Sequence, residues 1–332
     1  MATKAMNPTS SGMQRCRVAI TRALPPEAMD RFRARHDVWV NPADRVLTPV
    51  ELMQRAGEAD VIVVTAFDKF DANVIAALPP TLKILATHSV GLEHIDIKAA
   101  TARGLPVLAT PDVLSDAVAE MAILLMLGAS RRAQEGDRLV YSGQWKGWTP
   151  TQLVGVEVTG RRMGILGMGR IGRTIAQRAR GFDMAVQYHN RQRLAADLEQ
   201  GAAHHATLQG LLAASDVLVL AAPSTPETRG LLNGRTIAEL PKGAIVVNIA
   251  RGDLIDDDAL IAALTSGHLA AAGLDVFNGE PRLDERYKGL PNVFLQPHQG
   301  SSTLTARLAM AQILLDGIEA VLAGKAPINR VA

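Results

Sequence analysis

The sequence has little of what marks several large classes of protein. It contains a single cysteine, Cys16, which excludes an intramolecular disulfide and a cysteine-rich metal site, and we expect no metal centre. Neither sign of charge dominates, because 35 Lys and Arg residues face 33 Asp and Glu residues. Without a strong summed field, binding to nucleic acid or to an anionic membrane is not expected. We therefore expect a small-molecule partner.

Long apolar runs are also missing. The longest, residues 117–129, contains Glu120 and is too short to cross a bilayer. The N-terminus has no apolar core of the kind found in signal peptides. Residues 1–12 are polar and without pattern, so we expect them to be disordered. Together with the lone cysteine, these features predict a cytoplasmic location.

What the 332 residues do contain is two series of short runs rich in Val, Ile and Leu. The first series comprises residues 17–20, 60–64, 83–86 and 105–108. The second comprises residues 163–166, 184–188, 216–220, 244–248, 270–276 and 293–295. Such runs, alternating with longer stretches of helical period, are typical of βαβ units. We therefore predict an α/β fold with two doubly wound parallel-sheet domains of the Rossmann or flavodoxin-like kind.

Three segments between or after these runs are predicted to be helical or connecting. Residues 112–132 carry apolar side chains at helical spacing and end in two arginines, so they predict a long helix between the two series. Residues 302–322 are again helical, and they would return to the first domain if the second series is a compact insertion. His204 and His205 fall in an expected helical connector without a metal-ligand partner, and we interpret them as structural.

A glycine-rich motif lies between the expected strand 163–166 and the helical run 174–180. In this GxGxxG pattern the first glycine allows a tight turn, the second lets the backbone approach a pyrophosphate, and the third packs helix against strand. The N–H groups of the following helix face the anion. The strand, loop and helix context makes dinucleotide binding the preferred interpretation over a flexible loop. The predicted cofactor-binding residues of this loop are Gly167, Gly169, Arg170, Ile171 and Gly172.

The expected strand 184–188 lacks the acidic residue that usually comes after it and binds the ribose hydroxyls of NAD. In its place come Asn190, Arg191 and Arg193, which suit a 2′-phosphate better than a carboxylate would. We therefore predict NADP(H) as the preferred cofactor, with NAD(H) as the alternative. The two arginines are otherwise explained as exposed charges at the start of a helix.

Three ionisable residues come after the C-terminal ends of three successive expected strands: Arg251, Glu280 and His298. Ligands of open parallel sheets bind outside these strand ends, so the three side chains are expected to converge. Arg251 can hold a carboxylate and polarise a keto oxygen. His298 can deliver a proton, and Glu280 can bind the other imidazole nitrogen and fix its tautomer. This chemistry suits hydride reduction of a 2-keto acid.

Each of these residues also has an ordinary explanation when it is taken alone. An Arg-Gly pair often forms a turn, a Glu-Pro pair often forms a loop corner, and a single histidine is often a satisfied core or surface group. Their shared position after strands favours the catalytic interpretation.

The segments described above, with several others, resemble the D-isomer-specific 2-hydroxyacid dehydrogenase family, and within it the glyoxylate and hydroxypyruvate reductases. The matching segments are residues 88–96, 164–172, 223–228, 248–252, 273–277, Glu280-Pro281 and 297–301. The resemblance implies a discontinuous substrate-binding domain, residues 13–110 plus 300–332, and a dinucleotide-binding domain, residues 111–299. It also implies reduction of a small 2-keto acid, such as glyoxylate or hydroxypyruvate, to the D-2-hydroxy acid.

The resemblance assigns further site residues. The backbone at Val90 and Gly91 is expected to hold the substrate carboxylate together with Arg251 and His298. The residues expected near the cofactor are Pro223, Ile249, Asp275 and Gly300. The family also implies a homodimer, in which Trp148 is our candidate for an aromatic side chain that reaches the substrate pocket of the partner subunit. Ordinary interface packing is the alternative role for this tryptophan.

Two features depart from the family pattern and leave alternatives open. Gln299 and Gln296 flank the segment that carries His298, and both could shift specificity toward a larger keto acid. Within the family, D-3-phosphoglycerate dehydrogenase or another D-2-hydroxyacid dehydrogenase is the alternative. Outside the enzymes, a dinucleotide-sensing, corepressor-like binding protein shares the same fold and residues. The sequence has no low-complexity tail, which disfavours this alternative, and turnover would separate the two.

Overall fold

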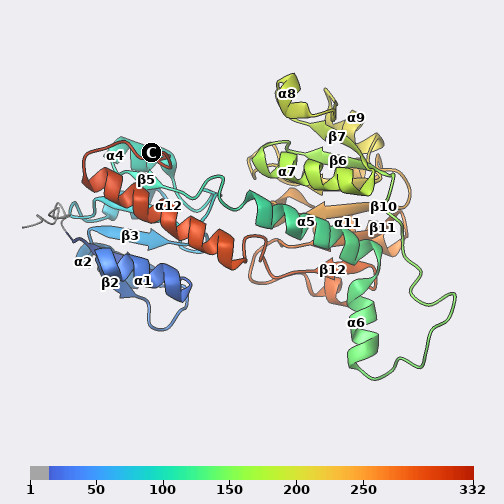
Figure 1. Ribbon diagram of the computed structural model, residues 1–332, viewed down its shortest axis with the longest axis horizontal. Helices are drawn as coiled ribbons and strands as arrows, with labels where there is room; N and C mark the ends of the chain where they lie inside the picture. The colour runs from blue at the N-terminus through green and yellow to red at the C-terminus, as the bar shows by residue number, and fades with distance from the viewer. Residues whose placement is uncertain (1–14) are drawn as a thin grey trace, which may run out of the picture. The chain divides into compact units, whose positions relative to one another are not determined.

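The computed structural model describes residues 15–332, drawn in Figure 1, and the expectations for residues 1–12 and for a domain start at residue 13 lie outside this range. The described residues form two compact units. Unit 1 comprises the residues up to Pro111 together with Arg307–Ala332, and unit 2 comprises Asp112–Ala306. The expected boundaries were 110/111 and 299/300. The assignment of substrate binding to unit 1 and cofactor binding to unit 2 stays a prediction.

Unit 1 is built on a parallel sheet with the strand order β2-β1-β3-β4-β5. Its elements are β1 (Arg17–Ile20), α1 (Pro26–Arg35), β2 (Asp37–Val40), α2 (Pro49–Glu58), β3 (Val61–Val64), α3 (Ala72–Ala77), β4 (Ile84–Thr87), α4 (Ile97–Arg103), β5 (Val107–Leu108) and α12 (Leu304–Leu322). This strand order is that of flavodoxin-like folds.

Helices cover both faces of this sheet, which explains why its strands are continuous apolar runs. Along β3, Val61 and Val63 pack in one core with α1 and α12, while Ile62 and Val64 pack in the other with α2, α3 and α4. Figure 1 shows α12, in red, running across the sheet to which β3 belongs. The expected return of the C-terminal helix to the first domain is therefore confirmed.

Unit 2 is built on a second parallel sheet, with the strand order β12-β11-β10-β9-β6-β7-β8. Its strands are β6 (Arg162–Leu166), β7 (Ala185–His189), β8 (Ala203–His204), β9 (Val217–Leu220), β10 (Ala244–Asn248), β11 (Leu269–Leu274) and β12 (Val293–Leu295). Its helices and 3-10 turns are α5 (Ser115–Ser130), α6 (Ala133–Tyr141), α7 (Arg170–Ala179), η1 (Arg180–Phe182), α8 (Ala196–Glu199), α9 (Leu208–Ala213), α10 (Gly234–Ile237), η2 (Gly252–Leu254), α11 (Asp257–Thr265) and η3 (Glu285–Gly289).

The strand order of unit 2 places the site-bearing loops along one edge of its sheet. The chain starts at β6 and builds outward in both directions, so the glycine-rich loop after β6 lies where the direction of winding reverses. Helices α5 and α7 pack together, and α5 crosses β11 so closely that a Cβ at Gly273 would lie 2.6 Å from the carbonyl oxygen of Leu125. Helices α9, α10 and α11 pack in the core on strands β9 to β11.

The two parallel sheets confirm the predicted α/β fold class. Two short edge strands were not predicted, β2 and β8. The helical interpretation of His204 is wrong, because this residue pairs in parallel with Tyr188 of β7, and His205 Nε2 lies 2.8 Å from the side-chain oxygen of Gln187. Among residues 15–332 no helix combines the length and apolar character needed to span a membrane.

Candidate active site

The glycine-rich loop joins β6 to α7, and the structure requires glycine at two of its three glycine positions, for different reasons. Gly167 has φ 97°, and a Cβ there would lie 2.6 Å from the backbone nitrogen of Ala222. At Gly172 a Cβ would lie 2.3 Å from the carbonyl oxygen of Gly167, so this residue lets the helix pack against the loop. At Gly169 a Cβ would meet no atom within 4 Å. A side chain at that position would instead fill the open space in front of α7.

The loop fits a dinucleotide pyrophosphate. Gly169 caps α7 without a side-chain hydrogen bond, so the first N–H groups of the helix face the open space beside this residue. Asn190, expected at the ribose, accepts a hydrogen bond from the backbone nitrogen of Met168 through its Oδ1 at 2.7 Å. Asn190 therefore fixes the glycine-rich loop, and only its amide N–H groups are left for a ligand.

The two arginines expected at the 2′-phosphate are in different situations. Arg193 donates two hydrogen bonds to the carboxylate of Glu199, at 2.8 and 3.0 Å. Arg191 is exposed, and its charge, after hydrogen bonds with Thr225 and with the backbone, contributes to lowering the pKa of Glu227. Arg191 therefore carries its charge near the segment after β9, which contains Pro223.

His298 and Glu280 come together after β12 and β11. His298 Nδ1 lies 2.6 Å from Glu280 Oε2, and Glu280 Oε1 accepts a hydrogen bond from the backbone nitrogen of Phe277 at 2.9 Å. Burial raises the pKa of Glu280, but the hydrogen bond and charge of His298, the Phe277 N–H and the charge of Arg251 outweigh burial and hold this pKa below its ordinary value. The carboxylate form of Glu280 therefore faces Nδ1, which leaves Nε2 for a substrate.

Asp275 shapes the turn that carries His298. Its two carboxylate oxygens each accept a backbone N–H at 2.8 Å, from Gln299 and from Gly300, and its carbonyl oxygen accepts the N–H of His298 at 2.8 Å. Burial raises the pKa of Asp275, against the opposing effects of these N–H groups and of the His298 charge. The turn holds His298 at φ 51°, a left-handed conformation that is uncommon for residues other than glycine. The carboxylate thus positions His298.

Arg251 comes after β10 and begins the short turn η2. The side chain of Asn248 closes this segment, donating to the carbonyl oxygen of Arg251 at 2.9 Å and accepting from the nitrogen of Ala250 at 3.0 Å. Arg251 Nη1 donates to the carbonyl oxygen of Ala250 at 2.6 Å. Its charge also contributes to lowering the pKa of Glu280, after the larger effects of His298 and the Phe277 N–H. Arg251, Glu280 and His298 therefore lie in one electrostatic environment within unit 2.

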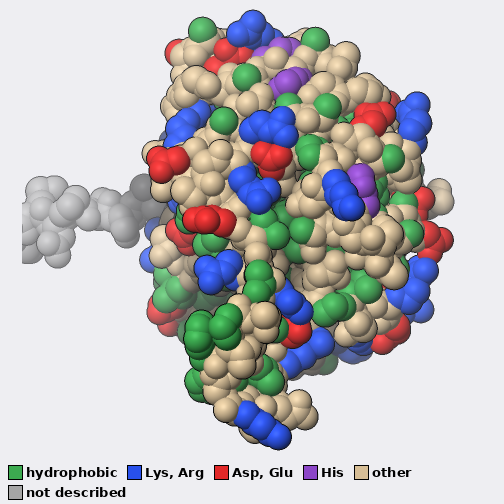
Figure 2. Space-filling view, turned by 90° about the vertical axis from the view of Figure 1, so that its right-hand side faces the viewer, with side chains coloured by type: hydrophobic (Ala, Val, Ile, Leu, Met, Phe, Trp, Pro, Cys, Tyr) green, Lys and Arg blue, Asp and Glu red, His purple; other side chains and the backbone are tan. Residues whose placement is uncertain are grey.

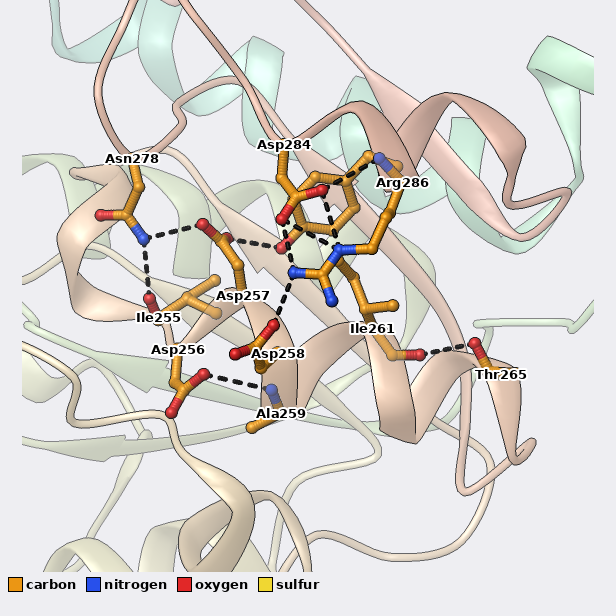
Figure 3. A network of polar contacts seen from close by, with 11 residues as sticks. Ile255, Asp256, Asp257, Asp258, Ala259, Ile261, Thr265, Asn278, Asp284 and Arg286 are labelled. Atoms are coloured by element: carbon orange, nitrogen blue, oxygen red, sulfur yellow. Dashed lines mark hydrogen bonds and ion pairs between the residues drawn. The ribbon is translucent and has the colours of Figure 1, made fainter.

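A polar network links the loop of Glu280 to the loop of Arg251 (Figure 3). The side-chain nitrogen of Asn278 donates to the carbonyl oxygen of Ile255 at 3.1 Å and to Asp257 Oδ2 at 3.0 Å. The buried Tyr287 hydroxyl donates to Asp257 Oδ1 at 2.7 Å. At Gly252 a Cβ would lie 1.9 Å from the carbonyl carbon of Phe277, so the two loops touch through their backbones. Sequence reasoning missed these residues, although the acidic start of α11 and the Asn-Gly-Glu-Pro run were visible.

The remaining predicted residues lie in both units. Val90 and Gly91 lie in unit 1, after β4, where the Ser89 hydroxyl donates to the carbonyl oxygen of Gly91 at 2.7 Å. Ile249 is buried directly after β10, Pro223 is exposed after β9, and Trp148 is exposed in the loop after α6. The roles assigned to these residues, and to Gly300, stay predictions.

Comparison with known proteins places the chain in a family. Residues 123–300 match the family described as D-isomer specific 2-hydroxyacid dehydrogenase, NAD binding domain. The chain is 43% identical over 314 residues to glycerate dehydrogenase of Hyphomicrobium methylovorum, covering 94% of this chain and 98% of that protein.

Solved structures agree over nearly the whole chain. A crystal structure from Polaromonas sp., of a protein assigned to the same family, superimposes with a TM-score of 0.92 at 53% identity and covers 96% of this chain and 100% of that one. The NADPH-dependent glyoxylate/hydroxypyruvate reductase of Sinorhizobium meliloti, in complex with NADP and malonate, superimposes with a TM-score of 0.85 at 31% identity, covering 96% and 97%. The chain, with its glycine-rich loop after β6 and its charged strand ends, belongs to the D-isomer specific 2-hydroxyacid dehydrogenase family.

Proposed function

We propose that the protein reduces a small 2-keto acid, of the glyoxylate or hydroxypyruvate type, to the D-2-hydroxy acid with NADPH. The observation that carries this proposal is the 2.6 Å contact between His298 Nδ1 and Glu280 Oε2, in the electrostatic range of Arg251. A proton donor beside an anion-binding arginine suits a substrate that bears both a keto group and a carboxylate. Relatives named glycerate dehydrogenase and glyoxylate/hydroxypyruvate reductase support this substrate class.

The side chains divide the reaction between them. Arg251 binds the substrate carboxylate with its forked N–H donors and polarises the keto oxygen. A reduced nicotinamide, when bound, supplies the hydride that adds to the keto carbon. His298 gives the proton on Nε2 to the keto oxygen, so that the product carries a hydroxyl group and the imidazole is left neutral. Glu280 stays ionised, holds Nδ1 and stabilises the imidazolium before the transfer.

NADPH is the proposed cofactor because of the residues at the end of β7. Asn190 and the exposed Arg191 stand there in place of a carboxylate, and a carboxylate would repel a 2′-phosphate. The reductase of Sinorhizobium meliloti, described as NADPH-dependent, supports the choice. NADH is expected to bind more weakly through the same glycine-rich loop. The same proposal assigns cofactor binding to unit 2 and substrate binding by the backbone of Val90 and Gly91 to unit 1.

A homodimer is part of the proposal. Figure 2 shows hydrophobic side chains gathered on the segment that projects at the lower end of this face. The exposed large hydrophobic residues of α6 and the loop after it are Val140, Tyr141, Trp145, Trp148 and Val154. None of the side chains of α6 is buried, although one face of the helix is apolar. An exposed apolar surface of this kind favours a protein partner, and we assign it to a second copy of the chain. Light scattering that gave the mass of one chain would contradict this assignment.

The proposed function is tested by measuring NADPH and NADH oxidation with glyoxylate, hydroxypyruvate, phenylpyruvate and 3-phosphohydroxypyruvate. Rapid NADPH oxidation by the two small acids is expected. Preference for the phosphorylated acid would favour the phosphoglycerate dehydrogenase alternative, and preference for phenylpyruvate would indicate a larger pocket. Cofactor binding without turnover of any keto acid would overturn the proposal and favour a dinucleotide-sensing protein. The expected cytoplasmic location stays a prediction.

A further inference from the structure

A buried carboxylate stands behind the segment expected to bind the adenosine ribose. Glu199 ends α8, and its side chain is only 9% exposed. Its Oε1 accepts hydrogen bonds from the hydroxyl of Tyr188, at 2.6 Å, and from Arg193 Nε, at 2.8 Å, while Oε2 accepts from Arg193 Nη2 at 3.0 Å. The hydrogen bonds from Arg193 and Tyr188 lower the pKa of Glu199 to about 2, so it is charged at neutral pH. A two-bonded pair of this kind fixes the guanidinium in place.

The segment between Asn190 and Leu194 is fixed at both ends, and the cluster around Glu199 fixes the Leu194 end. The backbone nitrogen of Leu194 donates to the Tyr188 hydroxyl at 3.0 Å. At the other end, Asn190 Oδ1 binds the backbone of the glycine-rich loop. Tyr188 itself is fully buried, so this anchor belongs to the core of unit 2. Arg191 lies between the two fixed points and is exposed.

The charges of the two arginines are therefore not equivalent. The charge of Arg193 is balanced by Glu199, which accepts two of its N–H donors, and moving this arginine to another anion would leave a nearly buried carboxylate unpaired. Among residues 15–332, no carboxylate forms an ion pair with Arg191. In this segment a 2′-phosphate would therefore meet one guanidinium without a hydrogen-bonded carboxylate rather than two, although the Arg191 charge also acts on Glu227.

We infer that Glu199 is a specificity-determining residue of the cofactor site: it neutralises Arg193 and fixes residues 190–194, so that Arg191 is the arginine that recognises the 2′-phosphate. Glu199 acts through Arg193 and is a positioning residue. The inference rests on the proposed use of NADPH, and it refines the prediction that Arg193 binds this cofactor directly.

A double-mutant cycle tests the inference through the ratio of kcat/KM for NADPH to kcat/KM for NADH. Glu199→Gln keeps an oxygen for the Tyr188 hydroxyl and releases Arg193, so the ratio should rise roughly 3- to 10-fold. Arg193→Gln leaves the Glu199 charge uncompensated, and the ratio should fall by a similar factor. The double variant should return to within about twofold of the wild-type ratio. A double variant as impaired as Arg193→Gln, with no gain in Glu199→Gln, would show that Arg193 binds the phosphate itself and would overturn the inference.

Binding measurements give a readout that does not depend on turnover. Calorimetric titration with adenosine 2′,5′-bisphosphate and with 5′-AMP measures how much the 2′-phosphate contributes to affinity. The ratio of the two affinities should rise in Glu199→Gln, fall in Arg193→Gln and return close to the wild-type ratio in the double variant. Arg191→Gln should remove most of the difference in affinity between the two probes. Glu285→Gln is the matched control, because it breaks an exposed pair with Lys288 of 2.7 Å elsewhere in unit 2 and should leave the difference unchanged.

Two further results keep the inference separate from the proposed function. If the wild-type protein binds both probes equally, the proposed NADPH preference fails, and so does the role of Arg191. The role of Glu199 is still tested, because Glu199→Gln should then create a preference for the bisphosphate by releasing Arg193. If Glu199→Gln does not fold, Arg193→Lys takes its place, since it keeps the charge opposite Glu199 and should stay near the wild-type ratio. A loss in Arg193→Lys as large as in Arg193→Gln would contradict the inference.

Discussion

The strand ends of unit 1 and unit 2 are alike in geometry and different in chemistry. In unit 2 the loops after β10, β11 and β12 carry Arg251, Glu280 and His298. In unit 1 the loop after β4 is held by neutral groups, with the Thr87 hydroxyl 2.8 Å from the Ser89 hydroxyl and the Ser89 hydroxyl bound to the next turn. The same doubly wound architecture thus places an arginine, a glutamate and a histidine after three successive strands of unit 2. After β4 of unit 1 it places a loop that hydroxyl groups brace and that also carries Glu93 and His94, with His94 Nε2 2.9 Å from the Thr87 hydroxyl.

The units also differ in the burial and the partners of a histidine near the strand ends. His298 is 38% exposed and bound to a carboxylate. His88 comes directly after β4, is buried, and burial together with the charge of Arg307 lowers its pKa to about 4. In the proposed reaction His298 exchanges a proton with the substrate, whereas His88 is kept neutral. The comparison teaches that residue type alone does not distinguish these roles, whereas the partner and the burial do.

The largest effect should come from removing the proton donor of unit 2. His298→Gln should lower kcat by about 10²- to 10⁴-fold, the usual range for loss of a general acid, while the affinity for NADPH stays within about twofold. Steady-state kinetics and fluorescence titration measure the two quantities. His268→Gln is the control, since the ring of His268 binds the carbonyl oxygen of Ile237 at 3.0 Å. Normal turnover in His298→Gln would remove His298 from the mechanism.

The glycine-rich loop offers a test without an unfolding artefact. Gly169→Ala places a methyl group where no protein atom lies within 4 Å, so the fold should be retained. The same methyl group would occupy the space expected for the pyrophosphate, and NADPH affinity should fall roughly 10- to 50-fold. Gly181→Ala, which also meets no atom within 4 Å, is the control. Equal NADPH affinities in the two variants would place the cofactor elsewhere.

The polar network in Figure 3 allows a test of whether its hydrogen bonds position the Glu280 loop or only stabilise the fold. Asn278→Ala removes two hydrogen bonds that hold the Glu280 loop, and kcat should fall about tenfold. Asn292→Ala removes two similar bonds, to the carbonyl oxygens of Leu264 and Ala270. Both variants should lose about 1–2 kcal/mol of unfolding free energy, but only the first should lose rate. A parallel loss of kcat in both would mean that the network acts through global stability alone.

The smallest effect concerns the neutral histidine of unit 1. The pKa of His88 is about 4 in the folded protein, below its ordinary value of 6.5, because burial disfavours the charged form. The unfolded chain therefore binds more protons, so this contribution is fully present above pH 6.5 and is lost as the pH falls through 4. It should amount to about 1 kcal/mol between pH 8 and pH 5.5. Denaturant unfolding of wild type and His88→Leu checks this, and an identical pH dependence in both would assign the loss to other groups.

Most of the central fold could be predicted because its strands are apolar on both faces. Residues such as Ile62 and Val63 face opposite cores, so the run they belong to is unmistakable in the sequence. The edge strands β2 and β8 were missed because they are short and their side chains are half-buried or exposed. Strand β2 has an apolar run of only three residues, Val38–Val40, and β8 has none. Edge strands are stabilised by pairing with a neighbour, and pairing is a tertiary property.

In the candidate site, too, tertiary contacts could not be predicted from local sequence patterns. Residues that are proposed to act on a ligand, such as Arg251, were chosen from their place after strands, and the structure confirms that place. Glu280 was predicted to bind His298, but other contacts between distant residues were not predicted, such as Asp257 with Tyr287 and Asp275 with Gly300. No local pattern indicates such contacts, because the partners lie far along the chain. The pairing of Arg193 with Glu199 is closer in sequence, but it depends on the short helix α8, which no pattern indicated.

The path of the chain has a consequence for how the protein is made. One core of unit 1 is completed by Ala311, Leu314, Leu315 and Ile318 of α12, which are synthesised after all of unit 2. Until these residues leave the ribosome, the apolar face formed by β1, β3 and α1 lacks its cover. Unit 2 is one continuous segment and is complete before then, so it is expected to finish folding first during synthesis although unit 1 begins the chain. A ribosome stalled near the C-terminus would hold a nascent chain with a folded second unit and an open first sheet, which is a binding site for chaperones.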